Sequence, residues 1–145
     1  MRSVKRLDTV NTAIEIHDSR VAEISERAGT VIVHFLPAYL HKSEGRPAID
    51  SGTGWIQEAR LVFFEASVSG EFPDWPCDIM DGGITVDGER HDNLIPLPLE
   101  AKGLIELRLI CDSIHTVAIK GRGARLELVG EPRYVEYFKD PSPEA

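Results

Sequence analysis

Apolar and polar residues alternate along residues 104–111, and this period of two limits the fold more than any other feature of the chain. The apolar side chains of one parity are Ile105, Leu107, Leu109 and Cys111. Glu106 and Arg108 occupy the other parity. Because successive side chains of a strand point to opposite faces, the pattern predicts a strand with one face in the core and the other in solvent.

The same period recurs through most of the chain. We predict further strands at residues 21–26, 30–36, 55–64, 84–86, 89–91, 116–120 and 124–129. In the strand at 55–64, Leu61 and Phe63 share one parity while Arg60 lies on the other. Turn residues separate several strands: Arg27-Ala28-Gly29 predicts one hairpin, and Asp87-Gly88 suits the positive φ angles of another.

Glycines also interrupt residues 120–125, between two of the predicted strands. We predict a chain reversal there, because the connections on either side are too short for a crossover helix. The strands at 104–111, 116–120 and 124–129 would then form an antiparallel meander.

The pattern as a whole predicts an all-β fold, an antiparallel β-sandwich or flattened β-barrel of about 7–10 strands with little helix. A chain of 145 residues suits one domain, which we place at residues 1–138, followed by a frayed tail at 139–145. Two prolines in residues 94–101 lack an amide donor, so this segment is predicted to be an edge or a crossing. Residues 3–16 fit either a helix or a strand.

The formal net charge of −8, from 24 acidic and 16 basic residues, restricts the partners. A surface of this sign repels phosphate backbones and anionic lipid headgroups, so we expect neither nucleic acid nor a membrane as a partner. The basic cluster at residues 120–125 is interpreted as a solvated hairpin tip. The acidic excess instead suits a basic protein partner, since opposite charges speed the encounter.

Residues 1–8 carry charge but no apolar segment follows them, so no signal peptide is predicted. No run of about 18 apolar residues predicts a membrane span. The two cysteines, Cys77 and Cys111, are too few for a disulfide framework. These observations together predict a cytoplasmic protein.

The letters IHDS at residues 16–19 recur as DSIH at residues 112–115, and histidine, aspartate and serine are the parts of a hydrolytic triad. Neighbouring residues point in different directions, so neither stretch can form a triad alone. If the stretches meet in space, they supply candidate ligand-binding residues, namely His17, Asp18, Asp112 and His115. If they lie apart, their Asp and Ser side chains are turn formers that bond nearby backbone N–H groups.

Metal binding needs several donors at suitable spacing, and the five histidines show none of the usual motifs. The acidic stretch at residues 78–89 lacks the donor spacing of a calcium loop. We therefore predict no metal ligand, no cofactor and no catalytic residue.

Trp55 and Trp75 are two further candidate ligand-binding residues. Together with Phe72 and the neighbouring prolines, they offer flat rings of the kind that stack on sugars. The alternative is that Trp55 opens a long strand and is partly in the core, while Trp75 lies in a loop at 72–76 that folds down on the sheet edge, because aromatic side chains bury more surface than any other type.

Several stretches resemble a group of small uncharacterised bacterial all-β proteins and, in part, polymorphic-toxin immunity proteins. They are 84–89 (ITVDGE), 93–98 (NLIPLP), 117–121 (VAIKG), 124–138 (ARLELVGEPRYVEYF), 17–21 (HDSRV) and 31–35 (VIVHF). The resemblance covers most of residues 16–138 and consists of strand and turn motifs. It implies a bacterial origin and no functional residue.

The leading functional prediction is a cytosolic, non-enzymatic protein-interaction module, of immunity type if the resemblance holds. The first alternative is a β module that binds a small molecule or carbohydrate. The second is a hydrolase that uses Cys111 or Ser113 with His115. We expect a monomer or a homodimer, since an exposed strand edge favours pairing with a second copy.

Overall fold

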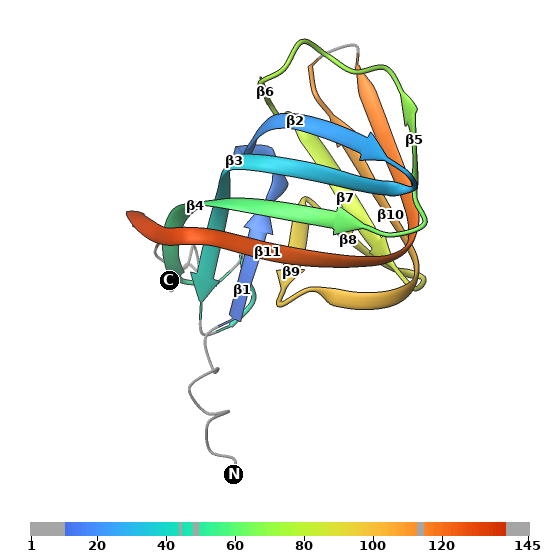
Figure 1. Cartoon of the computed structure of the whole chain (residues 1–145). Coiled ribbons are helices and arrows are strands. Elements are labelled where there is room, and N and C mark those ends of the chain that lie inside the picture. Colours follow the sequence, from blue (N-terminus) through green and yellow to red (C-terminus); the bar gives the residue numbers. More distant parts are fainter. Residues whose placement is uncertain (1–10, 44, 48–49, 113–114, 139–145) are drawn as a thin grey trace.

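The computed structural model describes residues 11–43, 45–47, 50–112 and 115–138 (Figure 1). It confirms the all-β prediction: the strands pair antiparallel in one strongly curled sheet, a half-barrel. The one helical segment in these ranges is the short 3₁₀ turn η2 (Ile16–Asp18). The predicted tail at 139–145 lies outside the described residues.

Eleven strands form the sheet. They are β1 (Asn11–Glu15), β2 (Arg20–Arg27), β3 (Thr30–Ser43), β4 (Gly52–Phe63), β5 (Ser67–Gly70), β6 (Cys77–Asp78), β7 (Asp81–Val86), β8 (Glu89–Asp92), β9 (Leu94–Leu97), β10 (Glu100–Ile110) and β11 (Thr116–Phe138). The main ladder runs β6-β2-β3-β4-β11-β10-β7-β8, while β1 joins β3 to β9 and β5 pairs with β11.

The two longest strands produce the curl, because each changes partner along its length. The first half of β3 pairs with β2 and its second half with β1, with a register shift between Phe35 and Ala38. The strand β11 begins beside β10 and β5 and continues beside β4. In Figure 1, β11 accordingly sweeps from the rear layer around to the front layer.

The predicted reversal at residues 120–125 is wrong, because this segment is the interior of the single continuous strand β11. Its glycines allow close approach of another backbone instead of a turn. The Arg122 N–H donates to Phe64 O at 2.9 Å, and the Phe64 N–H donates to Gly123 O at 3.0 Å. A Cβ at Gly121 would lie 3.0 Å from Phe64 O, so a larger residue would push this corner of the sheet apart. The basic cluster is therefore part of a bend and not a hairpin tip.

Other local predictions are confirmed. The hairpin between β7 and β8 has Asp87 and Gly88 at positive φ. The hairpin between β2 and β3 likewise has Ala28 and Gly29 at positive φ. The proline-containing strand β9 pairs with β1 alone, as expected of an edge. Residues 3–16 fit either a helix or a strand by sequence, and within them residues 11–15 form the strand β1.

The interior of the curled sheet is filled by one cluster of buried apolar side chains. Ile105, Leu107, Leu109 and Cys111 are all at most 1% exposed, which confirms the parity predicted for β10. Phe35 and Phe63 are fully buried, while Trp55 and Trp75 pack against the cluster from its margin. With the described interior occupied in this way, surface features become the main candidates for binding.

Two connections hold the ends of the curled sheet together. The Asn93 N–H donates to Gly82 O at 2.8 Å and its carbonyl accepts from Ile16 N at 2.9 Å, which links β7 to η2. On the other side, the Ile79 N–H donates to Ser19 O at 3.1 Å and the Met80 N–H donates to Ile110 O at 2.9 Å. The segment that leads from β6 into β7 is thereby fixed between β2 and β10.

Candidate functional site

The IHDS and DSIH stretches form two separate local pairs. His17 Nδ1 lies 3.2 Å from Asp18 Oδ1, and His115 Nδ1 lies 2.8 Å from Asp112 Oδ1. Strand β6 lies between the stretches, since it pairs with Arg20 and Val21 and its Cys77 contacts the Cys111 carbonyl. No hydrogen bond or ion pair within the described ranges joins one stretch to the other.

The Ser19 and Asp112 side chains bond backbone groups, as expected of turn formers. The Ser19 hydroxyl donates to Glu15 O at 2.8 Å and accepts from Tyr39 N at 2.9 Å. Asp112 Oδ1 accepts from His115 N at 2.8 Å. The structure thus supports the turn interpretation. Ser113, which the hydrolase alternative requires, lies outside the described residues.

The cysteine of that alternative is also poorly suited to attack a substrate. Cys111 is 1% exposed, and burial raises the pKa of its thiol to about 12. Burial likewise raises the pKa of Cys77. Since the thiolate is the nucleophile, Cys111 carries almost none of the reactive form at neutral pH.

The two tryptophans do not form one platform. The Lys42 ammonium lies 4.6 Å from the Trp55 ring centroid, and the Tyr134 ring meets Trp55 edge-on at 5.3 Å. Trp75 packs against Phe72 at 5.6 Å and against the core. Each ring thus has its own protein partners, and sugar stacking would have to displace Lys42 from Trp55.

A partly buried polar cluster at the junction of β1, β3 and β11 was not predicted from the sequence. His41 Nδ1 lies 2.9 Å from Glu15 Oε2, and the Tyr39 hydroxyl donates to Glu136 Oε2 at 2.6 Å. The Phe138 ring stacks on His41 with 4.7 Å between centroids. These contacts anchor the C-terminal part of β11 to β3.

Two glycines of β4 make room for this cluster. A Cβ at Gly54 would lie 1.9 Å from the Tyr39 hydroxyl oxygen, and a Cβ at Gly52 would lie 2.1 Å from Lys42 O. Positions 52 and 54 therefore require glycine for packing.

Glu15 should make the folded state less stable as pH rises. Burial is the main cause that raises its pKa above the ordinary value of 4.5, and Asp18 adds to the effect while the His41 hydrogen bond opposes it. The folded state then binds the proton more tightly than the unfolded state, so this contribution is complete below pH 4.5 and is lost as pH rises through the folded pKa.

The test is to measure the free energy of unfolding in urea for the wild type and for Glu15→Gln, from below pH 4.5 to above the folded pKa of Glu15. Glutamine keeps the hydrogen-bonding shape of glutamate but cannot ionise. We expect the wild type to lose stability relative to Glu15→Gln as the pH increases. A relative gain would mean that the pairing with His41 outweighs burial and lowers the pKa of Glu15.

Within the ranges described above, no group of three or more His, Cys, Asp and Glu side chains is arranged to hold a metal ion. None of the helical structure in those ranges is long and apolar enough to cross a membrane.

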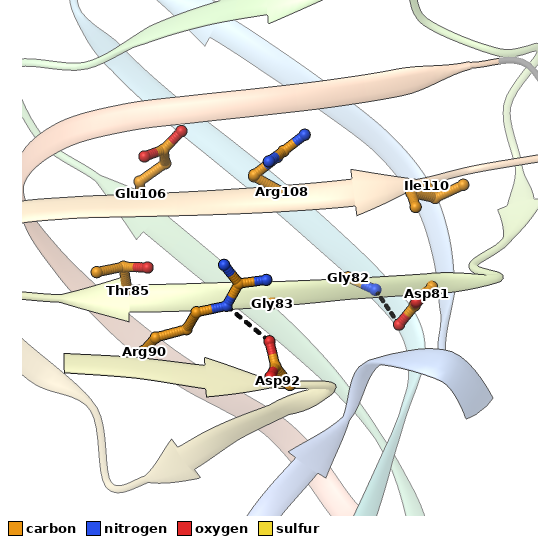
Figure 2. A pocket seen from close by; sticks show the side chains of 9 residues that line it. All are labelled: Asp81, Gly82, Gly83, Thr85, Arg90, Asp92, Glu106, Arg108 and Ile110. Atoms are coloured by element: carbon orange, nitrogen blue, oxygen red, sulfur yellow. Dashed lines mark hydrogen bonds and ion pairs between the residues drawn. The ribbon is translucent and has the colours of Figure 1, made fainter.

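The best candidate binding site is a solvent-open groove of about 470 Å³ on the outer face of β10, β7 and β8 (Figure 2). Its lining comprises Asp81, Gly82, Gly83 and Thr85 of β7, Arg90 and Asp92 of β8, and Glu106, Arg108 and Ile110 of β10. The floor is low at Gly83, where a Cβ would point into the groove toward Asp92, whereas a Cβ at Gly82 would point toward Ile16 and the core. Its volume lies within the range of about 300–1,000 Å³ common for ligand sites.

Charges of opposite sign face each other across the groove. In one cross-strand row, Gly83 lies between Arg108 and Asp92, and in the next, Thr85 lies between Glu106 and Arg90. Each wall therefore carries one positive and one negative side chain. Figure 2 shows Arg90 extending from β8 over β7 beside Gly83, where a side chain would otherwise stand.

Much of the hydrogen-bonding capacity in the groove is unused. Arg90 donates through Nε to Asp92 Oδ1 at 2.7 Å, which leaves the two terminal nitrogens of its guanidinium group. Neither the Arg108 nor the Glu106 side chain forms a hydrogen bond or ion pair with any described residue, although both backbones belong to the ladders of β10. The groove can thus offer guanidinium donors to an acidic group and a carboxylate to a basic one.

Sequence reasoning placed Glu106 and Arg108 on the solvent face of their strand but did not identify a groove. The available signal was Gly82-Gly83 inside a strand, since glycine in a strand marks a place with no side chain to pack.

A second exposed surface is the C-terminal part of β11, which pairs with β4 on one side. Its exposed apolar side chains are Leu128, Val129, Tyr134, Val135 and Tyr137. Pro132 lacks an amide donor and Gly130 has a φ of 75°, and the register shifts on both sides of Arg133 and Tyr134. Such interruptions protect an edge from pairing with another chain. Whether the protein is a monomer or a homodimer stays a prediction.

No protein-family model, curated protein or solved structure matches this chain.

Proposed function

We propose that this protein is a cytosolic, non-enzymatic protein-binding module that receives a segment of its partner in the groove over Gly83. The observation that carries the proposal is the unpaired Arg108 guanidinium beside the unpaired Glu106 carboxylate, both on one wall of a groove whose floor carries no side chain at Gly83. Side chains of this kind become favourable contacts only when a partner supplies the complementary groups.

The charge pattern indicates the chemistry of the partner segment. A segment lying along β7 would meet Glu106 and Arg108 on one side and Arg90 and Asp92 on the other. It would therefore carry both acidic and basic side chains. The formal net charge of −8 favours a partner that is basic overall, because long-range attraction raises the association rate.

The other candidate groups support binding more than catalysis. The histidines of the two echoing stretches are paired with their own aspartates, and the Cys111 thiol is buried with a raised pKa. The resemblance to immunity proteins, which act by binding a protein, supports the same class of partner and an immunity-like role.

Charge reversal at Arg108 tests the proposal. We expect Arg108→Glu to weaken partner binding at least about tenfold, because loss of one charged contact and the new repulsion together exceed 1.4 kcal/mol. The assay is affinity capture from the source cell at low salt, followed by titration of the captured protein. The matched control is Arg27→Glu, which makes the same charge change at an exposed arginine of β2.

The proposal requires the wild type and Arg27→Glu to retain the partner and Arg108→Glu to lose it. Equal affinity of all three proteins would remove the groove from the interface. A capture that returned nothing above background with the wild type would count against protein binding altogether.

A further inference from the structure

The two cysteines of the chain lie together although 33 residues separate them in sequence. Cys77 belongs to β6, the strand at one end of the main ladder, and Cys111 directly follows β10. The Cys77 thiol donates to Cys111 O at 2.7 Å, so the Cys77 sulfur lies directly against the residue that carries the second thiol. Strand β6 and the end of β10 both lie at the top of the molecule in Figure 1.

Backbone hydrogen bonds hold both cysteines in place. Cys77 pairs with Val21 of β2, and two residues further the Ile79 N–H donates to Ser19 O. On the other side, the Cys111 N–H donates to His115 O at 2.8 Å. The Met80 N–H donates to Ile110 O at 2.9 Å and so connects the two segments directly. Because these contacts exist before any reaction, the thiols do not need a change of fold to approach each other.

We propose that Cys77 and Cys111 form a redox modification site, at which oxidation joins them in an intramolecular disulfide that links β6 to the end of β10. The oxidant would be a low-molecular-weight disulfide such as oxidised glutathione. This inference is independent of partner binding in the groove.

The reaction consists of two thiol–disulfide exchanges. The Cys77 thiolate attacks one sulfur of the oxidant, the oxidant's sulfur–sulfur bond breaks, and one small thiol leaves. The Cys111 sulfur, held next to Cys77, then attacks the Cys77 sulfur, and its proton passes to the departing sulfur, which leaves as the second small thiol. Together the protein thiols lose two electrons and two protons, and the oxidant gains them. Cys77 reacts first because it is half-buried, whereas Cys111 is 1% exposed.

The product would close the open side of the curled sheet with a covalent bond. The ladder β6-β2-β3-β4-β11-β10 already connects β6 to β10 around the curve, and the disulfide would connect them directly. Closing a loop of this size restricts the unfolded chain and is expected to raise the Tm by roughly 5–10 °C.

Intact-mass analysis of the native protein tests the proposal. The wild type is incubated with oxidised glutathione, treated with N-ethylmaleimide, then unfolded and treated again. We expect a monomer that is lighter than the reduced chain by two hydrogen atoms and carries neither glutathione nor maleimide. Retained glutathione on the wild type, two alkylated thiols or a disulfide-linked dimer would each overturn the proposal.

Single variants establish the order of reaction. Cys111→Ala should retain one glutathione on Cys77, because no second thiol is present to release it. Cys77→Ala should keep Cys111 unreacted until the protein is unfolded. Thermal unfolding of oxidised and reduced wild type completes the test without a substitution, and a Tm that fell on oxidation would show that the native geometry does not accept the bond.

Discussion

Replacing Phe63 by alanine is expected to lower the free energy of unfolding by about 3–5 kcal/mol, the usual cost of removing a fully buried aromatic ring. Phe63 is 0% exposed in the core cluster, between Val31 of β3 and Ala124 of β11 in the cross-strand row. The loss would include the apolar area returned to water and the cavity left behind. Urea unfolding at fixed pH measures the difference.

The neighbouring ring supplies a matched control. Phe64 is 38% exposed, and the Arg125 guanidinium carbon lies 5.4 Å from its ring centroid. We expect Phe64→Ala to cost about 1 kcal/mol or less, since only a surface contact is lost. Similar losses for the two substitutions would contradict the inward orientation of Phe63.

The substitution Gly54→Ala is expected to destabilise the protein by about 1–3 kcal/mol through overpacking. The added Cβ would lie 1.9 Å from the Tyr39 hydroxyl oxygen and 3.1 Å from Phe138 Cε2. Tyr39 is 7% exposed, so its ring has little space to move, and any movement breaks its hydrogen bond to Glu136. The cost is again measured by urea unfolding.

Gly123→Ala is the control for the added methyl group, because its Cβ would make its nearest contact at an ordinary 3.4 Å, with Ala101 O. We expect it to cost clearly less than Gly54→Ala. A second comparison uses Tyr39→Phe as background, where the bond to Glu136 is already absent. Gly54→Ala should then cost less than in the wild type, and strict additivity would show that the hydroxyl contact is not the cause.

Local periodicity predicted several features of the fold correctly. The alternation around Leu107 identified the buried face of β10, and Asp87-Gly88 identified the hairpin between β7 and β8. These predictions succeed because side-chain direction in a strand and φ preference in a turn depend on the residue and its immediate neighbours.

The glycines near residue 121 show where local information is insufficient. Glycine suits a reversal and equally suits a bend that another backbone approaches closely. The decision between them depends on Phe64, whose N–H and C=O bond to this segment from another strand. The candidate residues are a second example. His17 and His115 each pair with the aspartate of their own stretch, so the repeated letters of IHDS and DSIH do not mark a shared site.

The sequence by itself determined that the chain forms an antiparallel β structure and which residues of β10 and β4 face the core, because both follow from a period of two along the backbone. Only the tertiary structure decided that Arg90 and Arg108 flank the same glycine floor, that Tyr39 bonds Glu136, and that Cys77 meets Cys111. Each of these contacts joins residues distant in sequence, so it depends on which strands the folded sheet brings side by side.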